Sequence, residues 1–593
     1  MKKSLFLLSV LLVSGCGHKE FDSSKSVQRL IGDFLFAEQT IRMDDPTFAV
    51  RSEKIGLKRY PCIVQHGNGR ISFYVQLKEE PKLEYTLHWA GQPGSDPDAR
   101  IVVETDFPDF FQREYRPKFG VREQIDLIEF QARAVRISFS ADNPLTVPIL
   151  WVEPTVEQTV RKNPVGQTTL AAVENLRQRQ RNHNVLIFLL DAARPLHFGS
   201  YGYSKPTTPT IDVLAREGVI FENAFTQAVY TIASTGSLFT GLYPDVHQVL
   251  YRKNKLPDQF KTMAEYLQEV GFRTDMFSAN GFGGPNFGYG QGFTKVWKLW
   301  YNPSMANAFV PAVTSWLKEV SNRRFFGYVH FREPHEPYRP PAEYLARFNT
   351  DLSFEPLKPP RPWTDEEKKK MVAAYDANLA YVDEQLGRIL EYMRTAGLME
   401  RTVIFILSDH GESFWEHGAR GHDTQVYEEM IRIPFIVRFP NEAVLQGVRK
   451  SQMVGTIDVL PTLMDLYGIS QRGVHIDGRS ILPLLVNDNH GGDRFLITRT
   501  NFEQAAYSLR TSSFKFIYHL KPLPDELYLL DSDPDERNNL SEIYPILASF
   551  YRTELRKRLQ QMDRSKRFLR VTTEQAIIDP ETEESLRALG YVN

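Results

Sequence analysis

The sequence of 593 residues contains only two cysteines, Cys16 and Cys62, which excludes a fold held by several disulfides. An excess of charge of one sign is also missing, because 71 Lys plus Arg face 73 Asp plus Glu. No basic stripe favours nucleic acid, and no nucleic-acid partner is expected. Beyond the amino-terminal signal, no apolar run is long enough to cross a membrane as a helix, and no internal repeat is present.

These absences leave a globular protein with more than one domain. Hydrophobic residues make up 42% of the chain and charged residues 24%, which is typical of a folded protein rather than a disordered one. A chain of 593 residues exceeds one ordinary hydrophobic core. We therefore expect two or three domains.

The amino terminus has the pattern of a secretory signal. Lys2 and Lys3 precede a short apolar run from Leu5 to Val13, which ends in Val-Ser-Gly-Cys16. This ending resembles the lipobox of bacterial lipoproteins, in which the cysteine becomes lipidated after cleavage. Residues 1–16 are thus interpreted as a lipoprotein signal, and lipidated Cys16 is expected to anchor the protein to a membrane of the bacterial cell envelope, outside the cytoplasm. The alternative is an ordinary signal with an incidental cysteine, and a lipidated Cys16 would leave Cys62 unpaired.

The region after the signal changes character twice. Residues 17–46 are polar and are interpreted as a tether. Within residues 47–155, the segments 70–77 and 134–139 alternate apolar and polar side chains between clusters of Pro, Gly and Asp. This pattern predicts an antiparallel β-sandwich, which either binds glycan or a partner or serves as a spacer. Residues 156–183 are polar and charged and are interpreted as a linker with some helix.

Residues 184–494 have the pattern of an α/β domain. Unbroken apolar runs at 184–190, 325–331 and 403–407 are typical of strands buried on both faces of a parallel sheet. Helices are expected between them, starting at Thr208–Pro209, at Thr262 and at Thr364, where Glu367 completes a capping box. The fold class is therefore α/β, doubly wound, with the N-terminal antiparallel β-sandwich and a small C-terminal subdomain at 495–593.

Polar side chains follow each of the three buried runs. Asp191 follows the first, His335 lies shortly after the second, and Asp409 and His410 follow the third. Functional groups collect at the carboxyl ends of strands in doubly wound sheets. Carboxylates, imidazole and a hydroxyl suit a divalent cation that polarises a phosphoryl or sulfuryl oxygen.

At this point the motifs resemble those of the sulfatase family of the alkaline phosphatase superfamily. The resemblance extends over about residues 184–593. It is carried in order by Asp191-Ala-Ala-Arg194-Pro195, Pro209 to Ala224, Thr231 to Gly241, His330-Phe-Arg-Glu-Pro334-His335-Glu-Pro337-Tyr338, Ser408-Asp409-His410-Gly411-Glu412, Gly421-His422 and Tyr427-Glu428-Glu429.

The resemblance implies a role for each matching residue. Asp191, Asp409 and His410 would hold one divalent metal ion, with Thr231 as a fourth ligand and the nucleophile. His335 and His422 would act on the transferred group or protonate the leaving oxygen. His247 and Arg194 are candidate substrate-binding residues. A His ligand favours zinc or manganese, and calcium stays an option.

The sequence also departs from the sulfatase pattern. Ala192 stands where sulfatases carry a second metal-binding aspartate, and His410 stands where many members have Asn. Thr231 occupies the position of the Cys or Ser that becomes formylglycine, and a threonine does not undergo that conversion. The site in this respect resembles the threonine branch, which includes phosphoethanolamine and phosphoglycerol transferases.

Simpler interpretations of single residues remain open. Asp191, Asp409 or Thr231 taken alone is compatible with a helix N-cap or a turn. His330, inside an apolar run, is interpreted as a core histidine. Tyr375 is interpreted as a packing residue.

The motifs together predict a metal-dependent hydrolase or transferase acting on sulfate or phosphate esters through Thr231. Its substrate is such an ester, including esters carried by a glycan or a lipid. The alternative is a catalytically silent sulfatase-like scaffold whose β-sandwich binds a glycan or a partner.

The anchor gives a first testable prediction. Cys16→Ser is expected to move the protein out of the lipid-modified membrane fraction, because two acyl chains hold a protein on a membrane and none would remain. Fractionation and mass spectrometry of the mature amino terminus measure this. Unchanged fractionation, with no acyl mass on the wild type, would rule the lipoprotein interpretation out.

Overall fold

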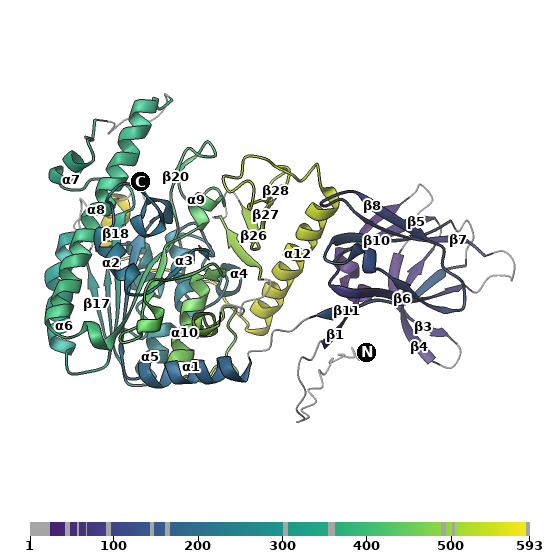
Figure 1. Cartoon of the computed structure of the whole chain (residues 1–593), viewed down its shortest axis with the longest axis horizontal. Coiled ribbons are helices and arrows are strands. Elements are labelled where there is room, and N and C mark those ends of the chain that lie inside the picture. Colours follow the sequence, from purple (N-terminus) through teal and green to yellow (C-terminus); the bar gives the residue numbers. More distant parts are fainter. Residues whose placement is uncertain are drawn as a thin grey trace. The chain divides into compact units, whose positions relative to one another are not determined.

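The structure is a computed structural model of the whole chain, and it forms two compact units, Met1–Pro164 and Val165–Asn593 (Figure 1). The lipobox at Cys16 lies outside the described residues. No helix among the described residues is both long and apolar enough to span a bilayer. The structure describes residues 24–41, 48–55, 58–66, 68–89, 96–142, 147–160, 166–299, 306–353, 362–487, 494–500 and 505–588.

The first unit is built from two antiparallel sheets. The alternation predicted around residues 70–77 and 134–139 places Val75 opposite Val135 in one sheet, with both side chains buried. The strands of one sheet are β3 (Phe48–Ile55), β4 (Lys58–Gln65), β11 (Ile149–Val160), β6 (Glu79–Trp89) and β9 (Arg122–Asp126), with β1 (Ser24–Arg29) on β11; those of the other are β2 (Glu38–Ile41), β5 (Gly69–Gln76), β10 (Ala134–Asp142), β7 (Asp98–Thr105) and β8 (Phe111–Tyr115).

Two segments of this unit differ from the expected boundaries. Residues 24–41, expected to belong to a tether, contribute β1 and β2, because their backbone groups pair with β11 and β5. Strand β11 continues to Val160, into the segment expected to be a linker. The buried rings of Trp151 and Phe139, 5.0 Å apart between centroids, lie in the core between the sheets.

The second unit is organised around an eight-stranded sheet. Strand β12 lies at its centre, parallel to both neighbours, and all eight of its residues are buried, as expected for a strand covered on both faces. The order is β17 (Lys295–Lys298), β16 (Arg273–Ser278), β18 (Phe325–Pro334), β12 (Asn184–Asp191), β19 (Thr402–Ser408), β22 (Phe435–Arg438), β13 (Val219–Phe221) and β23 (Val448–Lys450).

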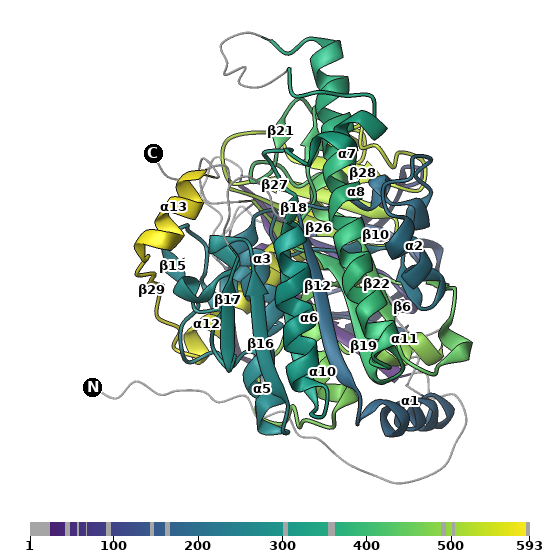
Figure 2. The same ribbon diagram turned by 90° about the vertical axis from the view of Figure 1, so that its left-hand side faces the viewer.

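Helices cover this sheet. In Figure 2, α6 (Phe309–Val320) and α8 (Asp365–Thr395) lie over one face, and their buried side chains share a core with Phe188 and Phe331 of the sheet. The capping box predicted at Thr364 and Glu367 starts α8. Helices α2 (Pro209–Arg216) and α5 (Met263–Glu269) begin where the sequence predicted. Helix α3 (Thr231–Thr240) is buried along its whole length and packs against α10 (Val459–Leu466).

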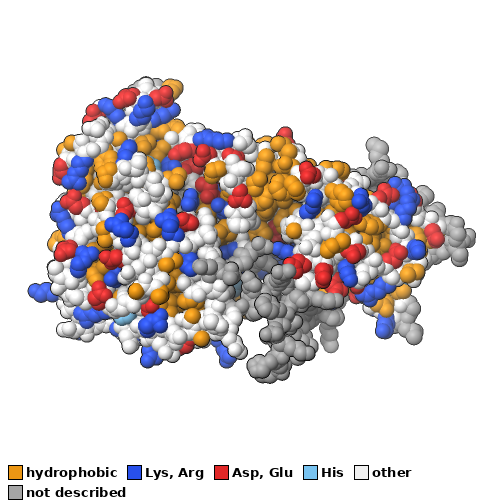
Figure 3. All heavy atoms as spheres, viewed as in Figure 1, with side chains coloured by type: hydrophobic (Ala, Val, Ile, Leu, Met, Phe, Trp, Pro, Cys, Tyr) orange, Lys and Arg blue, Asp and Glu red, His pale blue; other side chains and the backbone are white. Residues whose placement is uncertain are grey.

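The carboxyl-terminal part of this unit forms a four-stranded antiparallel sheet. Its order is β25 (Leu496–Arg499), β26 (Ala506–Arg510), β27 (Phe514–His519) and β28 (Glu526–Leu529), followed by α12 (Pro545–Phe568). On the face drawn in Figure 3, acidic and basic side chains are intermixed without a broad area of one sign, as the near-zero net charge of −2 predicts.

The turn after β12 is held in place by hydrogen bonds to the hydroxyl group of one buried tyrosine. Tyr375 on α8, which the sequence marked only as a packing residue, is fully buried. Its hydroxyl donates to the Ala192 carbonyl at 3.1 Å and accepts from the Arg194 N–H at 3.0 Å. Ala192 has φ +59, a conformation that side-chain-bearing residues rarely adopt, so external hydrogen bonds help to hold it.

Tyr375→Phe is therefore expected to lower the free energy of unfolding by about 1–3 kcal/mol, because two buried backbone groups lose their partner. Denaturant unfolding of the α/β unit measures the loss. Tyr392→Phe on the same helix is the control, since no hydrogen bond of its hydroxyl occurs within the described residues. Equal unfolding midpoints for the two variants would contradict this role of Tyr375.

Candidate functional site

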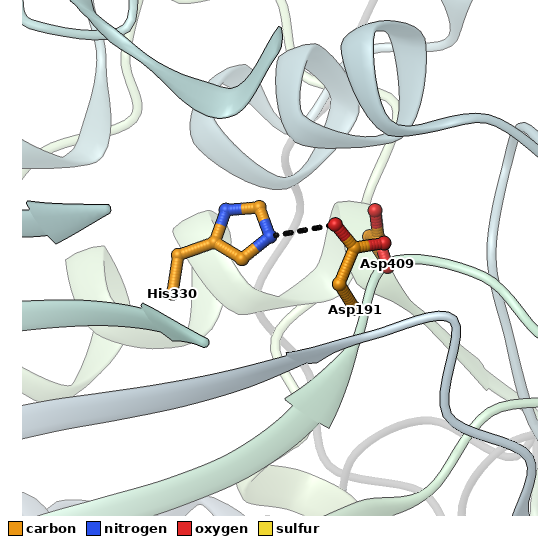
Figure 4. A group of neighbouring side chains, drawn as sticks. All are labelled: Asp191, His330 and Asp409. Atoms are coloured by element: carbon orange, nitrogen blue, oxygen red, sulfur yellow. Dashed lines mark ion pairs between the residues drawn. The ribbon is translucent and has the colours of Figure 1, made fainter. Parts of the chain in front are cut away.

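The site lies at the carboxyl ends of three adjacent strands. Because β12 pairs with β18 on one side and with β19 on the other, the ends of the three strands meet at one edge of the sheet. Asp191 is the last residue of β12, and Asp409 directly follows β19. His330 lies on β18 and points toward the two carboxylates (Figure 4). One ligand-type atom from each of these three residues lies within 4.8 Å of the others.

Both carboxylates are shut off from solvent. Asp191 is 0% exposed and Asp409 is 1% exposed. Asp409 Oδ1 accepts the backbone N–H of His410 at 3.0 Å and that of Ala192 at 3.2 Å. Asp191 Oδ2 accepts a hydrogen bond from the Asn280 amide. In the described part of the chain, Asp191 Oδ1 and Asp409 Oδ2 have no hydrogen-bond partner.

The buried carboxylates of Asp191 and Asp409 repel each other. Burial raises the pKa of the Asp409 carboxyl, and the negative charge of Asp191 raises it further. Two buried carboxylates that repel each other, each with an unpartnered oxygen, are stabilised by a cation placed between them. The arrangement therefore fits a metal ion better than it fits a set of N-caps.

His410 presents one nitrogen to the same space. Its Nδ1 lies 2.9 Å from the Gly411 carbonyl, which only accepts, so Nδ1 carries the proton and Nε2 has a free lone pair. Nε2 lies 3.4 Å from Asp409 Oδ2 and 3.7 Å from Asp191 Oδ1. This tautomer is the one that a metal ligand requires.

Thr231 faces this group from the first turn of α3. Its Oγ1 lies 3.4 Å from His410 Nε2 and 3.5 Å from Asn280 Nδ2. The side chain is 4% exposed, and the start of a ten-residue helix supplies free N–H groups and a partial positive charge beside it. The structure thus brings Asp191, Thr231, Asp409 and His410 together.

Two residues of this group were missed by the sequence. Asn280 follows β16. This strand is short and contains the charged residues Arg273 and Asp275, so its sequence did not predict a buried strand. His330 was interpreted as a satisfied core histidine, but its Nε2 has no hydrogen-bond partner among the residues described. Its neighbours Val329 and Phe331 pack in the core under α6 and α8, so alternation along the strand directs His330 to the opposite face.

A row of imidazoles extends the site. The ring of His422 lies 4.4 Å from that of His410, and the ring of His335 lies 4.8 Å from that of His422, between centroids. Burial opposes a charge on His422, but the Glu412 carboxylate, 3.1 Å from its Nδ1, raises the pKa of His422 to about 10. Burial lowers the pKa of His335 to about 4, although Asp191 acts in the opposite direction.

The buried Glu412 carboxylate is the partner of this row. Burial alone would raise its pKa, yet the His422 ring lowers it. The Tyr338 hydroxyl donates to its other oxygen at 3.0 Å. Glu412, which belongs to the motif at 408–412, is the fixed negative charge that orients His422.

The His247 ring contacts Gly236 and Ser237 in the middle of α3. Its Nδ1 accepts the Val249 N–H at 3.1 Å, and its Nε2 contacts Ser237 Oγ at 3.2 Å. Burial lowers the pKa of His247 to about 3, which keeps the ring neutral. A Cβ on Gly236 would lie 2.7 Å from this ring. The geometry favours a support for α3 over a contact with substrate.

Arg194 is also engaged within the protein. Its Nη1 lies 2.6 Å from Glu416 Oε1, and its guanidinium lies 5.3 Å from the centre of the Phe414 ring. The side chain is 4% exposed. The structure does not bring Arg194 to the Asp191 and Asp409 carboxylates, and its ion pair instead ties the turn after β12 to the segment before β21 (Arg420–Gly421).

Comparison with family models identifies two matching regions. The model described as Sulfatase matches residues 183–469, and the model described as N-sulphoglucosamine sulphohydrolase, C-terminal, matches residues 416–565. The first contains every residue of the site described above. The two together extend over the α/β domain and the four-stranded sheet.

Individual relatives and a solved structure agree with these matches. An Ulvan-active sulfatase of Formosa agariphila is 25% identical over 327 residues, which cover 55% of this chain and only 62% of that relative. The Uncharacterized sulfatase YidJ of Escherichia coli is 27% identical over 428 residues, covering 60% of this chain and 82% of its own. The phosphonate monoester hydrolase of Agrobacterium radiobacter shares the fold, with a TM-score of 0.55 at 21% identity over 64% of this chain and 96% of that one.

The geometry at the ends of β12, β18 and β19, the ordered motifs and the matching models agree with one another. The chain belongs to the sulfatase family of the alkaline phosphatase superfamily, whose members include ester hydrolases.

Proposed function

We propose that this protein is a metal-dependent ester hydrolase or transferase that acts on sulfate or phosphate esters, with Thr231 as its nucleophile. The observation that carries the proposal is the position of Thr231 Oγ1, 3.4 Å from His410 Nε2 at the start of a buried helix. Two buried carboxylates with unpartnered oxygens face the same space. The N-cap position of α3 is Tyr230 and Thr231 is the first residue of the helix, so its hydroxyl does not serve as the N-cap.

The residues suited to hold the ion are Asp191, Asp409, His410 and Thr231. A bound divalent cation would lower the pKa of the Thr231 hydroxyl and offset the negative charge of the ester. Thr231 Oγ would attack phosphorus or sulfur: the hydroxyl proton passes to solvent, a new bond forms to Oγ, and the bond to the leaving oxygen breaks. His335 and His422 would hold the ester oxygens, and His422, whose pKa is raised beside Glu412, would deliver a proton to the leaving oxygen.

The second step depends on the number of hydroxyl groups at residue 231. A formylglycine hydrate has two hydroxyls, so one bears the sulfate and the other expels it by reforming the aldehyde. Thr231 has one hydroxyl, so a second nucleophile must attack the covalent ester in line and release Thr231 Oγ. In-line displacement at phosphorus is accomplished by positioning and charge stabilisation. We therefore expect phosphoryl or substituted-phosphoryl transfer to exceed sulfate ester cleavage.

The acceptor in the second step decides between hydrolase and transferase. Water as the second nucleophile gives hydrolysis, and an alcohol gives transfer to that alcohol. The relative named Ulvan-active sulfatase supports a glycan ester as one class of substrate. The lipobox interpretation of Cys16 supports an enzyme that works outside the cytoplasm at a membrane, where esters carried by lipids are also available.

The ion gives the first prediction of this subsection. Asp409→Asn is expected to remove the bound ion and to lower kcat by at least about 1,000-fold, or about 4 kcal/mol in the activation free energy. Metal analysis of the purified protein and turnover of phosphate mono- and diesters measure the two effects. In metal-free protein the same change is expected to raise the unfolding midpoint, because the repulsion between Asp191 and residue 409 is lost.

Asp376→Asn is a matched control for that variant. Asp376 is a buried aspartate of the same unit whose oxygens interact with His197, Tyr203 and Lys205. It is expected to lower stability without removing the ion. Full turnover by Asp409→Asn after exhaustive chelation would refute a metal-dependent mechanism.

The nucleophile gives the second prediction. Thr231→Ala is expected to lose turnover by at least about 1,000-fold while still binding the ion through Asp191, Asp409 and His410. Thr231→Ser keeps a hydroxyl and should keep measurable activity. Brief exposure of the wild type to a phosphate ester, followed by mass spectrometry, should show a phospho-type adduct on the peptide that contains Thr231.

Two results would show this mechanism to be wrong. One is a wild-type rate for Thr231→Ala. The other is cleavage of aryl sulfates far faster than of any phosphate ester by the wild type.

A further inference from the structure

His330 is a buried imidazole to which the proposed mechanism assigns no role. It is 0% exposed, and its Nε2 lies 3.5 Å from Asp191 Oδ2 without forming a hydrogen bond to it (Figure 4). A fully buried ring nitrogen without a partner is rare in a folded protein, because it loses its bonds to water and gains none. A ligand on Nε2 removes this loss.

The other side of the ring is closed. The Tyr328 hydroxyl lies 3.4 Å from His330 Nδ1, and a Cβ on Gly283 would lie 2.6 Å from the same nitrogen. A glycine at 283 is therefore what allows the ring to take this position. The Tyr328 hydroxyl can accept from Nδ1–H, and in that tautomer the lone pair of Nε2 faces Asp191 and Asp409.

Three buried atoms thus converge without hydrogen bonds in the described part of the molecule: Asp191 Oδ1, Asp409 Oδ2 and His330 Nε2. Ligand-type atoms of these three residues lie within 4.8 Å of one another. His410 Nε2 lies 3.4 Å from Asp409 Oδ2 and 3.7 Å from Asp191 Oδ1. The two imidazoles come from different strands, β18 and the end of β19.

We propose that His330 Nε2 is a ligand of the divalent cation held by Asp191, Asp409 and His410, so that two imidazoles and two carboxylates bind the ion. This inference rests on the proposed function for the cation site itself. Its consequence is selectivity: imidazole nitrogen suits zinc and other transition metals, whereas calcium and magnesium prefer oxygen ligands. The site therefore binds zinc in preference to calcium.

A different role for His330 would be that of a charge partner for Asp191. A protonated ring would neutralise one carboxylate and would repel a cation. The two roles predict opposite effects of removing the ring: metal affinity falls if His330 is a ligand, and it rises or stays constant if His330 is a competing positive charge.

The experiment measures zinc affinity of the full chain by competition with a chelator and zinc content by elemental analysis. His330→Ala is expected to weaken zinc binding by more than 100-fold, beyond the roughly 10- to 100-fold effect of losing an outer hydrogen-bond partner. His183→Ala is the matched control, since His183 precedes the opposite end of β12 and bonds Gln180. It should bind zinc as the wild type does.

A second measurement does not depend on how the variant folds. X-ray absorption of the zinc-loaded wild type should show two imidazoles on the ion, and one imidazole would overturn the inference.

His330→Asp replaces nitrogen with oxygen and should shift the preference from zinc toward calcium; an unchanged preference counts against His330 as a ligand. Zinc binding by the wild type with unchanged affinity in His330→Ala refutes this inference alone, whereas a wild type that binds no cation refutes the proposed function as well.

Discussion

The repulsion between Asp191 and Asp409 is the constraint on which the rest of the site depends. Both side chains are buried, and each keeps one oxygen without a hydrogen bond among the described residues. The parallel pairing of β12 with β19 forces them together, because the two strands end at the same edge of the sheet. The sheet can hold this arrangement since its apolar strands are packed on both faces, and a cation turns the local repulsion into attraction.

Around these carboxylates the chain places groups in two layers. The first layer consists of polar groups that face the space between the carboxylates. They are the imidazoles of His410 and His330, the Asn280 amide, which donates a hydrogen bond to Asp191, and the hydroxyl of Thr231. The second layer consists of residues that hold these polar groups in position. Tyr375 fixes the turn at Ala192, and His247 packs against α3 with both ring nitrogens engaged. Replacing a residue of the second layer is expected to displace a polar group of the first, whereas replacing a residue of the first layer removes a group that faces the carboxylates.

The sequence predicted the parts of this site that depend on patterns along the chain. Buried apolar runs identified β12, β18 and β19, and the residues directly after them included Asp191, Asp409 and His410. Contacts between distant segments were not accessible in the same way. Asn280 follows a strand with two charged residues, and the role of His330 depends on which face of β18 it occupies and on the small Gly283. Residues 24–41 resembled a tether because their pairing partners, β11 and β5, lie far along the chain.

The departures from the sulfatase pattern at Ala192, Thr231 and His410 lie in one site. A site with Ala at 192 has lost a carboxylate oxygen, and imidazole nitrogens at 410 and 330 offer softer donors in the same space. A site with Thr at 231 lacks the second hydroxyl of a formylglycine hydrate, so under the proposed function a covalent ester on Thr231 would be released by an external nucleophile. Softer donors and in-line displacement both suit a transition metal and a phosphorus centre better than calcium and a sulfate ester. The ligand set and the nucleophile therefore point to the same change of chemistry on an otherwise sulfatase-like fold.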